Sequence, residues 1–231
     1  MNTPDGIHHI AICTADMRGQ LEFFSDVLGL KLVGLFWMHG VEGTWHAFMK
    51  LDEDSFLSFV QTPATPGIPR ELGVTHAGQP GGSSSSGTLQ HLALNVTDLD
   101  GLLTLRDRIR SRGVNVFGPL DHGLCHSIYF AGPEDLTLEI ATNGTLMTAK
   151  EWIDPEVVEI AGISPDELER FCDPAPFTAP PNPQAQPEIA PNKPHMRGYP
   201  DPIYRKIMET PDQVLNEAMS FNEAPVKVKK S

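Results

Sequence analysis

Short stretches in which apolar and polar residues alternate recur along the first part of the chain, and each predicts a strand with one buried face. In the stretch HHIAICT, His9 and Ala11 fall on one side and Ile10 falls on the other. Residues 17–29 have the apolar spacing of a helix instead, with Gly29 as its stop. Three more strand-like stretches follow, at 30–37, 43–51 and 55–61.

The same order of elements returns later in the chain. A strand, a helix and three further strands are predicted at 90–96, 99–113, 114–120, 126–132 and 136–142. The offset that aligns His9 with His91 also aligns Asp16 with Asp98. The pattern therefore predicts a duplicated βαβββ unit.

Changes in composition divide the chain into four parts. The first module takes residues 1–62, a Gly/Ser-rich segment typical of a flexible linker takes 63–88, and the second module takes 89–146. Residues 147–231 form an extension with a proline-rich middle and short helices. The extension has too few apolar residues for a core of its own, so we expect it to pack over the modules or across a partner chain.

Composition and charge narrow the classes of function. The chain has 231 residues, a formal net charge of −13 and three cysteines. We expect no binding to nucleic acid or to an anionic membrane surface, because both need clustered Lys and Arg. The odd number of cysteines and the lack of a signal-like N-terminal stretch predict a cytoplasmic protein.

The mixed faces of the predicted strands carry side chains that bind metals. His9 and His91 hold equivalent positions in the two units, and Glu139 and Tyr129 lie on mixed faces of the second unit. A single histidine on a strand is more often structural, but the repeated position favours a shared site. Two imidazoles and one carboxylate are the facial ligand set of non-haem Fe²⁺, and they also bind Zn²⁺, Mn²⁺ or Ni²⁺.

The predicted fold is therefore α+β, with two paired βαβββ modules that form a metal-binding cup and a proline-rich C-terminal extension. Two stretches also resemble a known family and support the same fold: HHIAI…LEFFSDVLGLKLV and QHLALNV…SIYFAGPEDLTLEIAT. They resemble the first and second units of the vicinal oxygen chelate superfamily, over about residues 6–144. That superfamily includes glyoxalase I, methylmalonyl-CoA epimerase, bleomycin- and fosfomycin-resistance proteins and type I extradiol dioxygenases.

The resemblance implies four metal positions. Three of them fall on His9, His91 and Glu139, and the fourth falls on Ser58. Glyoxalases and epimerases usually carry Glu or Gln at that fourth position, and serine is a poor ligand. The remaining set of two histidines and one glutamate is typical of the dioxygenase branch.

Two further stretches resemble hydroquinone ring-cleaving dioxygenases: GTWHAFMKL, and DHGLCHSIYFAGPEDLTLEIAT, in which Tyr129 would contact a phenolic substrate. The resemblance implies an Fe²⁺-dependent extradiol-type dioxygenase that acts with O₂ on a small aromatic diol or hydroquinone. His46, His122 and His126 are the candidates for the acid/base. His8 alternates to the side opposite His9 and is expected to be structural.

Two other functions remain open at this stage. A redox-neutral glyoxalase, epimerase or lyase would use the same metal to stabilise an enediolate. A small-molecule-binding resistance protein would keep the fold without the chemistry. We also expect a homodimer, because closed two-fold pairs dominate soluble oligomers.

Overall fold

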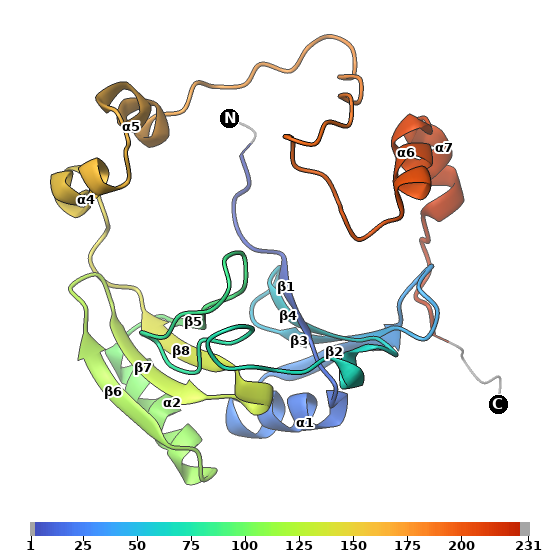
Figure 1. Ribbon diagram of the computed structural model, residues 1–231. Helices are drawn as coiled ribbons and strands as arrows, with labels where there is room; N and C mark the ends of the chain where they lie inside the picture. Colours follow the sequence, from blue (N-terminus) through green and yellow to red (C-terminus); the bar gives the residue numbers. More distant parts are fainter. Residues whose placement is uncertain (1–2, 227–231) are drawn as a thin grey trace, which may run out of the picture. The chain divides into compact units, whose positions relative to one another are not determined.

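The computed structural model of the protein describes residues 3–226, and its first module contains one mixed sheet (Figure 1). The sheet has the order β1-β4-β3-β2, with β1 parallel to β4 and the other pairs antiparallel. Its elements are β1 (His9–Cys13), α1 (Met17–Glu22), the π-helical turn η1 (Phe23–Val27), β2 (Lys31–Trp37), β3 (Trp45–Lys50) and β4 (Phe56–Gln61). The helix expected at 17–29 is thus an α-helix followed by a wider turn.

The second module repeats this arrangement. Its sheet has the order β5-β8-β7-β6, again with one parallel pair. Its elements are β5 (Leu92–Val96), α2 (Leu99–Ser111), β6 (Val116–Asp121), β7 (His126–Ala131), the 3₁₀ turn η3 (Pro133–Asp135) and β8 (Thr137–Thr142). The predicted α+β fold of two βαβββ modules is confirmed.

The helix starts show how closely the two units match. Asp16 caps α1 by accepting a hydrogen bond from the backbone N–H of Gly19, and Asp98 caps α2 by accepting one from Gly101. These caps stand at positions that the His9–His91 alignment makes equivalent. An aspartate at this position satisfies a backbone N–H that the first helical turn leaves free, which fixes where each helix begins.

One hydrophobic core lies between the sheets and the helices. The helix-facing side of the strands supplies residues such as Leu57, Phe59, Leu138 and Ile140, all essentially buried. The helices contribute the buried side chains Met17, Phe24, Leu102 and Ile109. The side chains of the other parity, including His9 and Ala11, form the opposite face of each sheet. We call this opposite face the open face.

Two polar contacts join the modules. Glu134, in η3 of the second module, accepts hydrogen bonds from the Thr14 hydroxyl, the Ala15 backbone N–H and the Gln20 amide at 2.5, 2.9 and 2.8 Å. Arg108 of α2 donates to the carbonyl oxygens of Ser25, Asp26 and Val27 at the end of the η1 turn. The second contact satisfies the carbonyls of Asp26 and Val27, which the end of a helix leaves unpaired, whereas the Ser25 carbonyl also accepts from the Gly29 N–H.

The segment between the modules folds into hydrogen-bonded turns. It contains the 3₁₀ turn η2 (Thr65–Gly67) and a bridge between Leu72 and His76. The Thr75 hydroxyl contacts the Glu71 backbone and His76 Nδ1, which closes this part of the loop. The flexibility that its composition indicates stays a prediction.

Between β8 and residue 226 the chain forms five short helices. Residues 4–38 and 43–174 make one unit, which contains both modules with α3 (Ala149–Trp152), α4 (Pro155–Ile160) and α5 (Pro165–Cys172). Residues 3, 39–42 and 175–226 make a second unit, with α6 (Asp201–Glu209) and α7 (Asp212–Met219). The packing of the extension on the modules or on a partner stays a prediction. Among the described residues, no helix combines the length and apolar character needed to cross a membrane.

Candidate functional site

Two of the three predicted metal ligands meet on the open face of the second module. His91 Nε2 lies 3.0 Å from Glu139 Oε2. Glu139 stands in the middle of β8 and is almost buried, and His91 directly precedes β5. The parallel pairing of Ala93 with Glu139 brings the start of β5 beside this carboxylate. The other ring nitrogen of His91, Nδ1, contacts the side-chain oxygen of Gln90.

Tyr129 and His122 extend this cluster. Tyr129 pairs with Glu139 across β7 and β8, and its hydroxyl lies 3.0 Å from His122 Nε2. Phe117 stacks on the Tyr129 ring with 5.2 Å between ring centroids. Burial raises the pKa of the Tyr129 phenol, and the negative charge of Glu139 adds to this effect, while a hydrogen bond with Ser127 opposes it. Tyr129 is therefore a protonated phenol at neutral pH.

His9 occupies the equivalent place on the open face of the first module, but it does not join His91 and Glu139. Its Nδ1 lies 2.9 Å from Nδ1 of His8, and its ring packs 5.6 Å from that of Phe48. The expectation that His8 points away from His9 is thus wrong, since their ring centroids lie only 5.2 Å apart. His8 precedes the first strand residue, so the strand alternation does not apply to it.

Ser58 and Phe48 take the places in the first module that Glu139 and Tyr129 take in the second. In the first sheet Ala11 pairs with Ser58 and Ser58 pairs with Phe48. The sheet of the second module has the same row, in which Ala93, Glu139 and Tyr129 are paired. The assignment of the fourth family position to Ser58 therefore agrees with the register of the strands.

His46 lies two residues before Phe48 on the same face of β3. It lies beside two aromatic rings, with its ring centroid 5.8 Å from that of Phe36 and 5.7 Å from that of Phe48. Both ring nitrogens are buried and have no hydrogen-bond partner among residues 3–226. Burial lowers the pKa of His46, and the nearby His9 lowers it further. His46 is therefore a neutral imidazole at pH 7, held in an aromatic wall.

His126 stands apart from this cluster. It has the strand parity of Ile128, which faces the helices, and its Nε2 lies 3.7 Å from Asp121. Within the described part of one chain, no group of three His, Cys, Asp or Glu side chains could hold a metal ion. One chain thus brings together two donors, His91 and Glu139, whose imidazole nitrogen and carboxylate oxygen fit two positions of a divalent metal.

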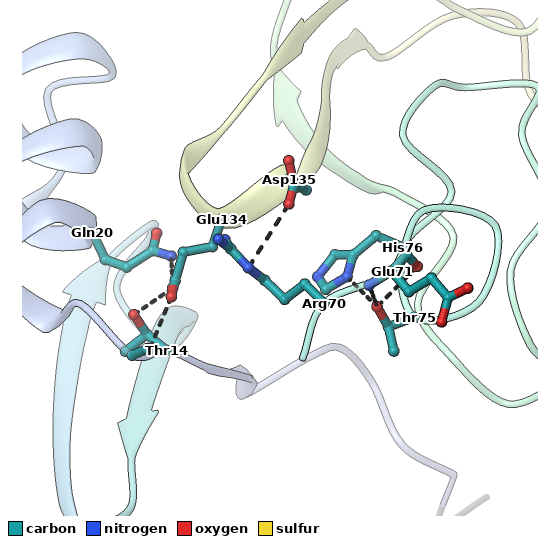
Figure 2. A network of polar contacts seen from close by, with 9 residues as sticks. Thr14, Gln20, Arg70, Glu71, Thr75, His76, Glu134 and Asp135 are labelled. Atoms are coloured by element: carbon teal, nitrogen blue, oxygen red, sulfur yellow. Dashed lines mark hydrogen bonds and ion pairs between the residues drawn. The ribbon is translucent and has the colours of Figure 1, made fainter. Parts of the chain in front are cut away.

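A cavity of about 630 Å³ adjoins His91. Its walls come from β1, from the loop at 65–77, from residues 89–91 and from residues 134–137. Figure 2 shows the contacts that hold these walls: Glu134 bonded to Thr14 and Gln20, and Arg70 Nε 3.8 Å from Asp135 Oδ2. The volume suits a small molecule.

No sequence pattern identified Gln90, Arg70 or Glu134 as residues of the candidate site. Gln90 stands beside a predicted ligand, but nothing in an isolated glutamine shows where its amide points. Glu134 and Asp135 both adopt a positive φ, at 55° and 63°, which only the folded turn displays.

A sequence model of the Glyoxalase/Bleomycin resistance protein/Dioxygenase superfamily matches residues 6–140. The chain belongs to this superfamily. The match spans both modules and ends inside β8, so the extension lies outside it. Among curated proteins, none matches the chain in sequence.

Several solved structures are similar to this chain. A glyoxylase/bleomycin resistance protein/dioxygenase domain from Frankia sp. EAN1pec shares 13% identity over 61% of this chain and 99% of its own, with a TM-score of 0.48. Lactoylglutathione lyase from Agrobacterium tumefaciens shares 17% identity over 60% and 94%, with a TM-score of 0.42. The fosfomycin resistance protein FosX from Listeria monocytogenes, in complex with Mn(II), shares 16% identity over 62% and 96%, also with a TM-score of 0.42.

Membership sets the general class of function. The superfamily's name joins glyoxalases, bleomycin resistance proteins and dioxygenases, so it includes enzymes.

Proposed function

We propose that this protein is a metal-dependent enzyme that acts on a small aromatic diol or hydroquinone, as an Fe²⁺ extradiol-type dioxygenase. The contact of His91 Nε2 with Glu139 Oε2 at 3.0 Å is the observation that carries the proposal. It pairs an imidazole nitrogen with an almost buried carboxylate beside a cavity of suitable size. A shared cation would satisfy both groups.

The third ligand in this proposal is His9 of a second copy of the chain. His9 lies on the open face of module one, at the position equivalent to His91, and is separate from the pair in its own chain. A two-fold dimer in which module one of each copy faces module two of the other would form two equal sites. Each site would contain two histidines and one glutamate.

The side chains around the pair suit a phenolic substrate. Bound Fe²⁺ would supply open coordination positions for O₂ and for a substrate hydroxyl. Tyr129, kept protonated, would donate a hydrogen bond to a substrate oxygen. His122 contacts the Tyr129 hydroxyl and is exposed, so it would pass a proton between the tyrosine and water.

The first module would supply ring contacts and a base. Phe36 and Phe48 are nearly parallel, and His46 lies beside both rings. A flat aromatic ring packs well against such a wall. The lowered pKa of His46 makes it a neutral acceptor for a phenol proton.

The test is oxygen uptake by protein purified without chelator under anaerobic conditions and reloaded with Fe²⁺. We expect uptake with at least one catechol or hydroquinone in a broad panel. A lack of uptake across the panel would contradict the dioxygenase proposal. Turnover of an α-hydroxy or thiohemiacetal substrate without O₂ would point to a redox-neutral enzyme, and purified protein that binds no metal would point to a binding protein.

A further inference from the structure

The side-chain amide of Gln90 is oriented by the backbone of the loop before it. Its Nε2 lies 3.3, 2.8 and 2.9 Å from the carbonyl oxygens of Gln79, Pro80 and Gly82. Carbonyl oxygens only accept hydrogen bonds, so the NH₂ group must face them. The backbone thereby settles which end of the amide points to the loop and which end points to His91.

That orientation determines the tautomer of His91. The Gln90 oxygen faces His91 Nδ1 and can only accept, so Nδ1 carries the hydrogen. The other nitrogen, Nε2, lies 3.0 Å from Glu139 Oε2, and that carboxylate is also an acceptor, so without a metal the two atoms share a proton. Gln90 thus takes the N–H of Nδ1 and turns Nε2, the nitrogen needed for a metal bond, toward the other proposed ligand, where a cation would replace the shared proton.

We propose that Gln90 is a positioning residue, which holds His91 in the Nδ1–H tautomer and ties the proposed metal site to the loop at 79–82. The part that concerns metal affinity rests on the proposed function. The tautomer itself does not, because it follows from contacts within one chain.

A tight turn at Gly82 lets the loop present its carbonyl oxygens to Gln90. The Gly82 N–H bonds to the Gln79 carbonyl at 3.0 Å and closes a tight turn. A Cβ at Gly82 would lie 2.2 Å from the Ala77 carbonyl oxygen, so any side chain there must displace the turn. Because the turn presents the carbonyls to Gln90, a substitution at Gly82 would disturb the orientation of Gln90 and then of His91, although neither of these residues is replaced.

The first module has a related contact of a different kind. His8 stands directly before His9, and their Nδ1 atoms lie 2.9 Å apart. An imidazole nitrogen can donate or accept, so His8 leaves two tautomers open to His9. Gln90 leaves one to His91, which makes the histidine of the second module the preorganised ligand.

The experiment measures the His91 tautomer in full-length, metal-free protein by ¹⁵N NMR of labelled histidines, with a His91→Asn variant for assignment. We expect a hydrogen on Nδ1 of His91 in the wild type and in Gln79→Leu, whose exposed side chain takes no part in the contact. In Gln90→Leu and Gly82→Ala we expect a larger share of the form with hydrogen on Nε2 alone, because the Glu139 carboxylate is then the acceptor that remains. A wild type in which Nδ1 carries no hydrogen would overturn the proposal, whether or not the variants fold.

A second measurement follows Fe²⁺ affinity by competition with a chromophoric chelator. Loss of a group that orients a ligand costs roughly 10–100-fold in affinity, so we expect that drop for Gln90→Leu and a similar trend for Gly82→Ala. Gln79→Leu should match the wild type. Unchanged affinity and tautomer in folded Gln90→Leu would overturn the role of Gln90. A wild type that binds no metal but shows the Gln90-dependent tautomer would overturn the metal proposal and leave the positioning role supported.

Discussion

The two modules share one backbone plan but differ on their open faces. In the second module, Glu139 and Tyr129 pair in the centre of the sheet and contact His91 and His122. The first module has serine and phenylalanine at the two central positions, Ser58 and Phe48. One face is a connected polar cluster. The other is an aromatic wall in which the His46 ring nitrogens and the Ser58 hydroxyl have no hydrogen-bond partner among residues 3–226.

The helix-facing sides of the same strands have remained alike. Leu57 and Leu138 are equivalent, and so are Phe59 and Ile140, and all four side chains are apolar and buried. Close packing against the helices restricts these positions to apolar side chains, whereas the open faces do not pack against helices and accept polar ones. A duplicated unit can therefore keep its fold and divide the chemistry between its two halves.

The largest expected effects on stability are at the buried, helix-facing positions, where the two modules are alike. Replacing Leu57 or Leu138 by Ala opens a cavity in the shared core, and each change should lower the free energy of unfolding by about 2–5 kcal/mol. Urea denaturation measures both. If one variant lost most of its stability and the other almost none, the two cores would not be equivalent.

A large effect that separates the modules is expected at Glu139. Glu139→Gln should abolish measurable Fe²⁺ binding, because it removes the charged donor beside His91, while Ser58→Ala should leave the metal content unchanged. Metal analysis of protein purified without chelator compares the two variants. Metal loss in Ser58→Ala with retention in Glu139→Gln would reverse the assignment of the two faces.

An intermediate effect is expected at the junction of the modules. Burial raises the pKa of Glu134, but hydrogen bonds from Thr14, Ala15 and Gln20 and the charge of Arg70 outweigh it, so the net pKa is below its ordinary value of 4.5. Its contribution to stability is therefore complete above about pH 4.5 and is lost as the pH falls through the lowered pKa.

Thermal unfolding of the wild type and Glu134→Gln between pH 3 and pH 7 tests this. The wild type should be more stable at pH 7, and the difference should shrink toward low pH. Glu71→Gln is the matched control, since the side-chain carboxylate of Glu71 is exposed and the loop contacts made by this residue use its backbone. A difference that stays constant with pH would show that the Glu134 charge does not matter.

The sequence predicted the fold correctly where one spacing of apolar residues continues along a whole strand or helix. Alternation predicted all eight strands of the modules, because each strand packs one side on helices. The family resemblance implied a metal position at Ser58, which the register makes equivalent to Glu139. Contacts between segments that are far apart in the sequence could not be predicted from it. Thr14 and Glu134 are 120 residues apart, and nothing local to either indicates their hydrogen bond.

The same limit applied to the candidate site. Equivalence of His9 and His91 was readable as a repeated position, but their separation within one chain depends on how the sheets lie side by side. His122 and His126 flank the same strand start, and only the folded hairpin places His122 on Tyr129 and His126 near Asp121. The choice between them required the path of a turn, which alternation does not encode.

The smallest expected effect is a change in the free energy of unfolding that has opposite signs on the two open faces. Ser58 and Ser127 are both fully buried on open faces, but the Ser58 hydroxyl has no hydrogen-bond partner among the described residues, whereas the Ser127 hydroxyl lies 3.3 Å from Cys125 Sγ. An unpaired buried hydroxyl costs about 1–3 kcal/mol. Ser58→Ala should therefore raise the free energy of unfolding by about 1 kcal/mol, and Ser127→Ala should lower it by a similar amount. Urea denaturation at low protein concentration, where a dimer would dissociate, measures the two signs. A loss of stability in Ser58→Ala that appears only at high concentration would mean that the hydroxyl finds its partner in a second copy of the chain.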